Sequence, residues 1–191
     1  MISAILLAAG QSKRLKVQNK LIKKYKNKSL INYPLSALIK SKVKKIIIVL
    51  GYQSNEIKKI IKKNKKIIFI KNIEYRTGIS SSIKTGIKKV SKKDKGFIIL
   101  QSDMPFIKTS DINKIYNSII KHNHLVHVLK YKNKIGNPIG FDISVINKFK
   151  KIKGNFGAKF MVKKLKNSSN FIQVNSIKKF KDFDLKTDFE K

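Results

Sequence analysis

The stretch Ile2–Lys20, ISAILLAAGQSKRLKVQNK, decides how the rest of the chain is interpreted. Its apolar run leads directly into Ala8-Ala9-Gly10, which predicts a buried strand that ends in a turn of small residues. A ligand can approach the backbone of such a turn closely, and two cations, Arg14 and Lys20, follow it. A strand, a small-residue loop and nearby positive charge are the components of a site for nucleotide phosphates. An ordinary strand-to-loop connection in a lysine-rich protein also explains these residues, so the rest of the chain has to decide.

Length and composition indicate one globular domain that spans residues 1–191. Hydrophobic residues make up 41% of the chain and aromatic residues 9%, which is enough for a buried core. Cysteine is absent from the sequence, and this excludes disulfides, thiolate catalysis and cysteine-ligated metals. The apolar runs are too short to span a bilayer and no signal-like segment opens the chain. We therefore expect a soluble, cytoplasmic protein that does not enter a membrane.

The charge balance is unusual, with 45 Lys and Arg against 10 Asp and Glu, a formal net charge of +35. Such an excess can attract nucleic acid, anionic membranes or polyanionic small molecules. Nearly all of it is lysine spread along the whole chain, whereas a specific nucleic-acid surface usually concentrates charge and uses arginine. We therefore interpret the lysine content as a compositional bias and expect no nucleic-acid partner. Arginine occurs only at Arg14 and Arg76, and these two residues are more informative.

Apolar strands alternate with amphipathic helices along the chain. After the opening strand, apolar runs predict buried strands at 45–51, 67–70, 96–101, 125–129, 138–141 and 171–174. Apolar residues at helical spacing predict helices near 32–39, 54–61, 80–90, 109–120 and 156–165, the first of them capped by Asn32. This alternation predicts an α/β fold with a mainly parallel sheet that helices cover on both faces. Ligands bind such sheets at the carboxyl ends of the strands.

Asp103 follows the predicted strand 96–101 almost directly, and Pro105 restricts the turn after it. A carboxylate at the carboxyl end of a strand, beside a phosphate-binding loop, can hold Mg²⁺ on a triphosphate. Capping of a turn or helix is the ordinary alternative for an aspartate in this place. Because the chain has only 10 acidic residues, we favour the metal.

Three further groups of polar residues are candidates for a site. Ser80, Ser81 and Ser82 open a predicted helix, where free N–H groups favour anionic ligands, although N-capping accounts for one of them. Asn137 before Pro138 can hydrogen-bond a ligand, but from the residues alone an ordinary Asn-Pro turn explains it somewhat better. The carboxylates Asp182, Asp184 and Asp188 stand out in basic surroundings, as a second metal contact or as a salt-bridged surface, and taken alone they favour the surface.

Several common classes of site are excluded by their missing motifs. The histidines His122, His124 and His127 lack the spacing of a zinc site, so we expect them to be structural. The chain contains no Gly-x-Ser-x-Gly elbow, no Gly-x-Gly-x-x-Gly fingerprint and no Gly-x-x-x-x-Gly-Lys loop. A serine hydrolase, an ordinary NAD enzyme and a P-loop NTPase are therefore disfavoured.

With these residues assembled, the chain resembles the molybdenum cofactor cytidylyltransferases, within the wider MobA-like nucleotidyltransferases, over its full length. The most specific part is Leu7-Ala8-Ala9-Gly10-Gln11-Ser12-Lys13-Arg14 with Lys20 after it. Five further segments are similar to the family. The first is 72–82, which contains Glu74, Gly78 and the three serines, and the second is Ser102-Asp103-Met104-Pro105. The others are Gly136-Asn137-Pro138, where the family has Gly-His-Pro, then Gly154–Ala158 and Asp182–Asp188. The chain departs from the pattern at Leu15-Lys16, where Met-Gly is usual, and at Lys186, where proline is usual.

The resemblance implies a three-layer Rossmann-like fold of the nucleotide-diphospho-sugar transferase type and a Mg²⁺-dependent transfer of CMP from CTP to the phosphate of molybdenum-bound molybdopterin, with release of pyrophosphate. It places the nucleotide on Leu7, Ala8, Ala9, Gly10, Gln11, Arg14, Lys20, Gly78, Ser80 and Ser81. In the same comparison Arg14, Lys20 and Asp103 are catalytic, Asp103 and Asp184 hold the metal, and Asn137 and Pro138 lie on the acceptor side. Ala9 stands where the guanylyl branch has a second glycine, and its methyl group is expected to crowd a purine. A molybdoenzyme or its chaperone is the implied partner.

Two alternatives remain open at this point. A related nucleotidyltransferase could use GTP or a sugar-phosphate or alcohol-phosphate acceptor, although the Gly-x-Gly-Thr-Arg and Pro-Lys signatures of those enzymes are missing. A basic nucleic-acid-binding protein on the same fold would bind DNA with an affinity that falls steeply with salt. The dispersed lysines and the lack of an aromatic stacking platform disfavour it.

Overall fold

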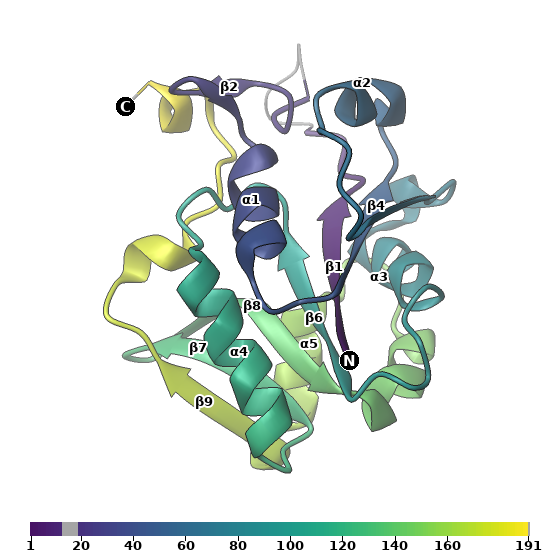
Figure 1. Ribbon diagram of the computed structural model, residues 1–191, viewed down its shortest axis with the longest axis vertical. Helices are drawn as coiled ribbons and strands as arrows, with labels where there is room; N and C mark the ends of the chain where they lie inside the picture. Colours follow the sequence, from purple (N-terminus) through teal and green to yellow (C-terminus); the bar gives the residue numbers. More distant parts are fainter. Residues whose placement is uncertain (13–18, 191) are drawn as a thin grey trace.

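A seven-stranded mixed sheet forms the centre of the molecule, with the strand order β5-β4-β1-β6-β8-β7-β9 (Figure 1). The computed structural model describes residues 1–12 and 19–190. The strands of the sheet are β1 (Ile2–Ala8), β4 (Lys45–Leu50), β5 (Ile67–Lys71), β6 (Gly96–Gln101), β7 (Val126–Tyr131), β8 (Lys134–Asp142) and β9 (Ser169–Gln173). Strands β5, β4, β1 and β6 are parallel to one another, β8 is antiparallel to β6 and β7, and β9 is parallel to β7. The predicted α/β fold with a mainly parallel sheet is confirmed.

Helices cover both faces of this sheet (Figure 1). The helices are α1 (Asn32–Lys40), α2 (Ser54–Lys59), α3 (Ile79–Ile87), α4 (Thr109–Lys121) and α5 (Ala158–Lys164). Shorter elements are the hairpin of β2 (Lys24–Tyr25) and β3 (Lys28–Ser29) and the 3₁₀ segments η2 (Tyr75–Thr77), η3 (Ile143–Lys151), η4 (Lys166–Ser168), η5 (Ile177–Phe180) and η6 (Lys186–Phe189). Helices α1 and α4 pack on one face and α3, α5 and η3 on the other, which makes three layers.

Strand β1 contributes side chains to both hydrophobic cores, one on each face of the sheet. Successive side chains of a strand point to opposite faces, so Ile2 and Leu6 enter the core under α1 and α4, while Ile5 and Leu7 enter the core under α3 and α5. All seven residues of β1 are buried, as expected for a strand with neighbours on both sides. This rigid central strand delivers the loop 9–12 to the carboxyl edge of the sheet.

Local details differ from the sequence-based expectations. The strand at 67–70 is not buried, because β5 pairs only with β4 at the edge of the sheet and leaves Ile68 39% and Phe69 37% exposed. Asn32 is the first residue of α1 rather than its cap, and its amide donates a hydrogen bond to the Ile60 carbonyl at 3.2 Å. The short strand expected at 138–141 extends over all of β8, and it bulges at Asn137 and Pro138, which have no partner in β7.

The C-terminal segment returns to the carboxyl edge of β1 and β6 after β9 (Figure 1). The backbone N–H of Phe183 donates to the Asp103 carbonyl at 3.0 Å. The ring of Phe183 is 1% exposed and packs edge-on against Tyr25 and Phe106, with centroid distances of 4.8 and 5.8 Å. This packing brings Asp184 beside Asp103. Among the described residues, no helix has the length and apolar character needed to cross a membrane.

Candidate active site

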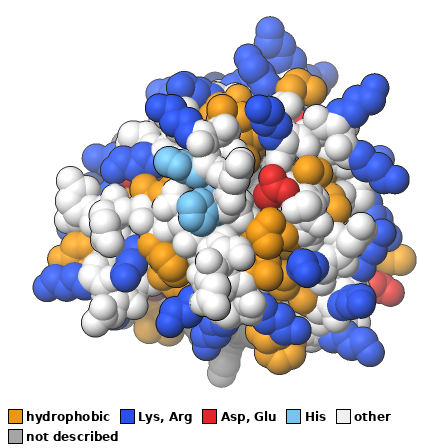
Figure 2. Space-filling view, turned by 90° about the horizontal axis from the view of Figure 1, so that it is seen from below, with side chains coloured by type: hydrophobic (Ala, Val, Ile, Leu, Met, Phe, Trp, Pro, Cys, Tyr) orange, Lys and Arg blue, Asp and Glu red, His pale blue; other side chains and the backbone are white. Residues whose placement is uncertain are grey.

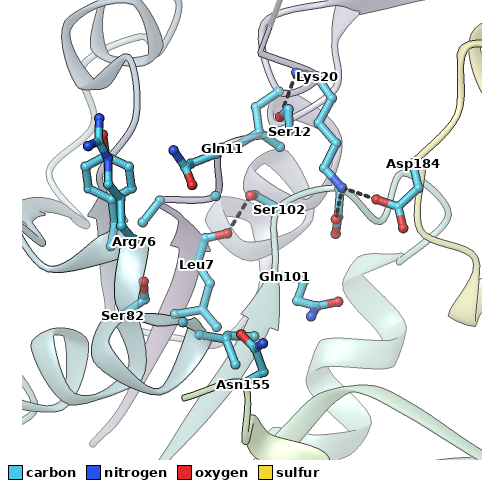
Figure 3. Close-up of a pocket in the computed structure, with 17 residues that line it drawn as sticks. Leu7, Gln11, Ser12, Lys20, Arg76, Ser82, Gln101, Ser102, Asn155 and Asp184 are labelled. Atoms are coloured by element: carbon cyan, nitrogen blue, oxygen red, sulfur yellow. Dashed lines mark hydrogen bonds and ion pairs between the residues drawn. The ribbon is translucent and has the colours of Figure 1, made fainter. Parts of the chain in front are cut away.

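A cavity of about 480 Å³ opens where the carboxyl ends of β1 and β6 meet (Figure 3). Its walls come from five parts of the chain: the loop after β1, the segment from η2 to α3, the end of β6, the segment around Asn155 and the segment around Asp184. The lining residues are Leu7, Ala9, Gly10, Gln11, Ser12, Lys20, Leu21, Tyr75, Arg76, Gly78, Ile79, Ser82, Gln101, Ser102, Asp103, Asn155 and Asp184. The site thus lies at the strand ends where the sheet architecture predicts it.

The loop after β1 contacts the end of β4 through Ala9 and the segment that carries Lys20 through Ser12. The Ala9 carbonyl accepts a hydrogen bond from the Tyr52 N–H at 3.3 Å, and a Cβ at Gly51 would lie only 2.7 Å from the Ala9 carbonyl oxygen. Gly51 therefore has to be a glycine for the loop to sit this close to the end of β4. Ser12 has a positive φ of 54°, and its hydroxyl accepts from the Lys20 N–H at 3.1 Å.

Asn19 fixes the start of the segment that carries Lys20. Its side chain is fully buried, accepts a hydrogen bond from the Leu21 N–H at 3.0 Å and donates one to the Tyr52 carbonyl at 3.4 Å. Lys20 consequently projects into the cavity from a backbone that is tied to the loop after β1. Arg14, the other predicted cation, lies outside the described residues.

Lys20 forms the electrostatic centre of the cavity (Figure 3). Its Nζ lies 2.6 Å from Asp103 Oδ2 and 2.6 Å from Asp184 Oδ1. The side chains of Lys20 and Asp103 are each only 15% exposed, so both ion pairs are shielded from solvent. Burial lowers the pKa of Lys20, but the two carboxylates outweigh this effect, and the pKa is raised above its usual value. Lys20 thus remains an ammonium ion held between two carboxylates.

Asp103 has the chemistry of a cation ligand. Its Oδ1 atom is buried and, within the part of the chain that is described, has no hydrogen-bond partner. Burial raises the pKa of Asp103, and Lys20 opposes this rise only in part. A buried carboxylate oxygen without a donor is costly unless a ligand satisfies it. The residues present therefore fit a hard divalent cation, with Asp103 and Asp184 as oxygen ligands.

Two carboxylates alone do not complete a metal site. Among the described residues, no group of three or more His, Cys, Asp or Glu is arranged to hold a metal ion. Mg²⁺ is commonly bound by one or two carboxylates together with substrate phosphates and water. The donor set of this cavity is therefore suited to a metal that arrives with a phosphate ligand.

The opposite wall is organised by Asn72 and the start of α3. The Asn72 amide donates to Ser81 Oγ at 2.9 Å and to Ser82 Oγ at 3.0 Å, and Ser81 Oγ donates in turn to the Glu74 carbonyl at 2.9 Å. All three serines are buried, and of the three it is Ser82 that lines the cavity, whereas Ser80 and Ser81, both predicted to contact the nucleotide, do not. Ser81 thus acts in the hydrogen-bond network that shapes the wall.

Gly78 joins this wall to the segment that carries Asn155. Its φ is +115°, and a Cβ there would lie 2.3 Å from the Gly154 carbonyl oxygen, so no side chain fits. The same carbonyl accepts a hydrogen bond from the Ser80 N–H at 3.1 Å. The close approach of the two backbones fixes where Asn155 enters the cavity.

Most residues predicted from the sequence meet in this cavity, and a few lie elsewhere. Those that line it are Leu7, Ala9, Gly10, Gln11, Lys20, Gly78, Asp103 and Asp184. Ala8 is 1% exposed and belongs to the core under α1, because its side chain points to the face opposite that of Ala9. Asn137 and Pro138 lie in the bulge of β8 and do not line the cavity. Asp188 accepts hydrogen bonds from the N–H groups of Asp184 and Leu185, each at 2.9 Å.

Other lining residues were not among the site residues predicted from the sequence, although Arg76 was noted there as one of two arginines. Gln101 and Ser102 stand at the end of β6, and the Ser102 hydroxyl donates to the Leu7 carbonyl at 2.6 Å, which ties β6 to β1. Arg76, the second arginine of the chain, projects beside Tyr75 with its Cζ 5.7 Å from the ring centroid (Figure 3). Polarity at the carboxyl end of a buried strand was the available signal for Gln101.

The histidines lie away from the cavity. His127 is fully buried in β7, with its Nδ1 2.7 Å from Ser118 Oγ, and burial lowers its pKa to about 4. None of the three lines the cavity. For His127, this environment agrees with the predicted structural role.

Comparisons with known proteins bear on the family and the fold of the chain. A model of the MobA-like NTP transferase domain matches residues 4–169. The bifunctional protein GlmU of Clostridioides difficile is 27% identical over 139 residues, which cover 72% of this chain but only 29% of that protein. The chain thus spans less than a third of the length of that curated relative.

Solved structures share the fold across almost the whole chain. Rv0371c of Mycobacterium tuberculosis H37Rv superposes with a TM-score of 0.85 at 18% identity, covering 99% of this chain and 95% of that one. Its complex with manganese gives a TM-score of 0.76 at 15% identity, with 92% and 88% covered. Mth528, a nucleotidyl transferase of Methanothermobacter thermautotroptrophicus, gives 0.82 at 16% identity, with 100% and 94% covered. By the family model and by its fold, the chain belongs to the family of the MobA-like NTP transferase domain.

Proposed function

We propose that this protein is a nucleotidyltransferase that moves CMP from CTP to the phosphate of molybdenum-bound molybdopterin and releases pyrophosphate. The observation that carries the reaction class is Lys20, held between Asp103 and Asp184 at the end of a small-residue loop. The choice of CTP and of molybdopterin rests on the resemblance of the motifs Leu7–Arg14 and Ser102–Pro105 to the cytidylyl branch.

The loop after β1 is the proposed phosphate cradle. Gly10 and Gln11 line the cavity, and a Cβ added to Gly10 would meet no atom of the described residues within 4 Å, so on that side the backbone is open to a ligand. N–H groups in such a loop can donate to the oxygens of a triphosphate. Arg14 and Lys20 supply positive charge toward the pyrophosphate that leaves.

Asp103 and Asp184 are the proposed ligands of Mg²⁺, which neutralises phosphate charge when bound and makes pyrophosphate a better leaving group. Lys20 lies between these carboxylates in this structure, and we infer that it turns to the phosphates when a nucleotide enters. The exchange keeps the carboxylates paired with a cation at each stage, as their low exposure requires.

The chemical step needs no further group from the protein. An oxygen of the acceptor phosphate attacks the α-phosphorus, the bond from that phosphorus to the bridging oxygen breaks, and the electron pair leaves with pyrophosphate. Since the nucleophile is already an anion, alignment and charge neutralisation carry the catalysis. Lys20 would stabilise the charge that develops on the leaving oxygen.

Roles in substrate specificity are proposed for the remaining residues from their positions relative to the cavity. Ala9 lines it but is only 3% exposed, so we propose that its methyl group limits the base by a small contact that disfavours a purine. Gln101 and Asn155 lie at the end of the cavity away from Lys20 (Figure 3), and we propose that they bind the base or the acceptor. For Asn137 and Pro138 we propose only an indirect role, through the bulge that they form in β8.

The test is pyrophosphate release with each of the four nucleoside triphosphates, with and without molybdenum cofactor, and with a sugar phosphate as an alternative acceptor. We expect release with CTP and molybdenum cofactor, and calorimetric binding of CTP with Mg²⁺ tighter than that of GTP. Equal affinity for CTP and GTP would contradict the cytidylyl assignment. Release only with the sugar phosphate would retain the reaction class and replace the acceptor.

Asp103→Asn tests the reaction class itself. The variant keeps the size of the side chain and removes its charge, and we expect pyrophosphate release to fall by at least about 100-fold because the metal loses a carboxylate ligand. Glu56→Gln is the matched control, since its exposed side chain lies in α2 and does not line the cavity. Undiminished turnover of Asp103→Asn would remove Asp103 from the metal site.

A further inference from the structure

A second hollow of about 670 Å³ is lined by residues of η3, of α5 and of the loop between them. It shares no lining residue with the active-site cavity. The loop between these elements contributes Asn155 to the first cavity and Phe156 to the second. We call the second hollow the α5 groove. Its residues are Asn147, Lys148, Lys151, Ile152, Lys153, Phe156, Phe160, Met161, Lys164 and Leu165.

The floor of the α5 groove is apolar and one aromatic side chain stands open to solvent. Ile152 and Met161 are buried at 4% and 2% exposure, whereas Phe156 is 53% exposed. The rings of Phe156 and Phe160 stack with their centroids 4.4 Å apart and an interplanar angle of 30°. A concave apolar surface with an exposed aromatic residue is typical of a site that binds a partner.

The rim of the groove is positive and has no internal counter-charge. Lys148, Lys151, Lys153 and Lys164 surround it, and no Asp or Glu occurs in the sequence between Asp142 and Asp182. None of these four lysines has an ion pair within the described residues. Lysines are also numerous on the face shown in Figure 2, so the rim charge alone would not mark a site. The combination of this charge with the apolar floor and the exposed ring of Phe156 does mark a site.

We propose that the α5 groove docks an acidic, amphipathic segment of a partner protein. Apolar side chains of that segment would enter the groove against Phe156 and Met161, while its carboxylates face the lysine rim. This is the helix-in-groove mode of recognition combined with complementary charge, which speeds association and selects acidic partners. The proposal does not depend on which nucleotide or acceptor the active site uses.

The aromatic pair argues for a protein segment over a single-stranded nucleic acid. Successive bases stack on several open rings, but only Phe156 is exposed here, since Phe160 is stacked by Phe156 and Lys164 Nζ lies over its ring at 4.9 Å from the centroid. The rim also contains no arginine, the residue that stacks on bases and forks to phosphates. A hollow of this volume instead suits aliphatic and aromatic side chains.

The position of the groove places its occupant beside the active site. The Gly154 carbonyl accepts a hydrogen bond from the Ser80 N–H, so the loop that ends in Phe156 is fixed to the start of α3. A partner on Phe156 therefore lies one residue from Asn155 at the edge of the cavity. Docking here suits a protein that receives the product or presents the acceptor.

The test uses the full chain and a fluorescein-labelled helical peptide of about 16 residues, with Leu and Phe on one face at i, i+3, i+4 and i+7 and Glu on the other. Fluorescence anisotropy should show saturable binding that weakens as salt rises. Phe156→Ser and the double variant Lys148→Glu/Lys151→Glu should each weaken binding by at least about tenfold. Matched controls elsewhere, Ile120→Ser and Lys62→Glu/Lys63→Glu, should leave it within about twofold.

Further probes separate this site from general attraction to a basic protein. A peptide of the same composition with its apolar residues scrambled off one face should bind at least about tenfold more weakly. A single-stranded oligonucleotide should not displace the helical peptide at equal salt. Equal binding of both peptides, equal losses in the control variants, or no saturable binding would overturn the proposal. Oligonucleotide binding that Phe156→Ser abolishes would assign the groove to nucleic acid instead. Thermal melts of all four variants check that each is folded.

Discussion

Replacing Lys20 by methionine tests whether this lysine occupies the place of a divalent cation. Methionine keeps the length and the apolar stem of the side chain but removes the ammonium group. In the native chain, a metal ion that binds Asp103 and Asp184 without a nucleotide has to displace two ion pairs of 2.6 Å. In Lys20→Met, the same carboxylates are left without that competitor.

The magnitude follows from the two hydrogen bonds of Lys20. A hydrogen bond to a charged group contributes about 1.5–3 kcal/mol, so releasing both costs about 3–6 kcal/mol. The Asp184 side chain is 31% exposed, which places the effect at the lower end of this range. Since about 1.4 kcal/mol corresponds to a factor of ten, Lys20→Met should bind Mn²⁺ about 100-fold more tightly than the native chain in the absence of nucleotide.

The assay is calorimetric titration of Mn²⁺ into the native chain, Lys20→Met and the control Lys23→Met, each with and without CTP. CTP should strongly tighten Mn²⁺ binding to the native chain, because the phosphates attract Lys20 away from the carboxylates. This dependence on CTP should be much smaller in Lys20→Met. Lys23→Met removes one positive charge that has no ion pair among the described residues and does not line the cavity, so it should behave like the native chain.

Thermal unfolding gives an independent check. Without metal, Lys20→Met should melt at a lower temperature than the native chain, because two poorly exposed carboxylates then repel each other, and Mn²⁺ should restore its stability. If Lys20→Met binds Mn²⁺ no more tightly than Lys23→Met, Lys20 does not stand in for the cation, and the proposed exchange is refuted.

Three further predictions concern the scaffold of the site and its response to pH. Gly78→Ala should destabilise the chain by about 2 kcal/mol or more and weaken nucleotide binding, because the new Cβ meets the Gly154 carbonyl at a positive φ; denaturant titration and calorimetry measure both. Asp188 has a pKa lowered to about 2: burial opposes the shift, but hydrogen bonds from Leu185 and Asp184 and the Lys181 ion pair outweigh it. Asp188 therefore contributes about 2 kcal/mol to the free energy of unfolding above the pKa of an unfolded aspartate, and this contribution is lost as pH falls toward 2. The difference in unfolding free energy between the native chain and Asp188→Asn should accordingly shrink below about pH 4. His127 has a pKa lowered to about 4 by burial, so the unfolded chain binds more protons between about pH 4 and 6.5, and stability should rise with pH across that window in the native chain but less in His127→Gln.

The sequence by itself determined the architecture and the opening loop. The alternation of apolar runs and amphipathic helices predicts a sheet covered on both faces, because burial on two sides requires near-continuous apolar strands. The order Ile5–Leu7, Ala8–Gly10, Asp103 also places a small-residue loop and a carboxylate at strand ends. Each of these features is encoded by residues that are neighbours in the sequence, so each can be predicted from a short segment.

The tertiary structure alone decided which side chains meet. Ala8 and Ala9 look alike in the sequence, but alternation along the chain turns Ala8 into the core under α1 and Ala9 to the opposite face, where it joins the core under α3 and lines the cavity. The buried appearance of Ile67–Ile70 did not reveal an edge strand, because strand order is a property of the whole sheet. Asp184 reaches Lys20 from 164 residues away because Phe183 packs into the aromatic cluster beside Tyr25, and no local pattern encodes a contact of that span.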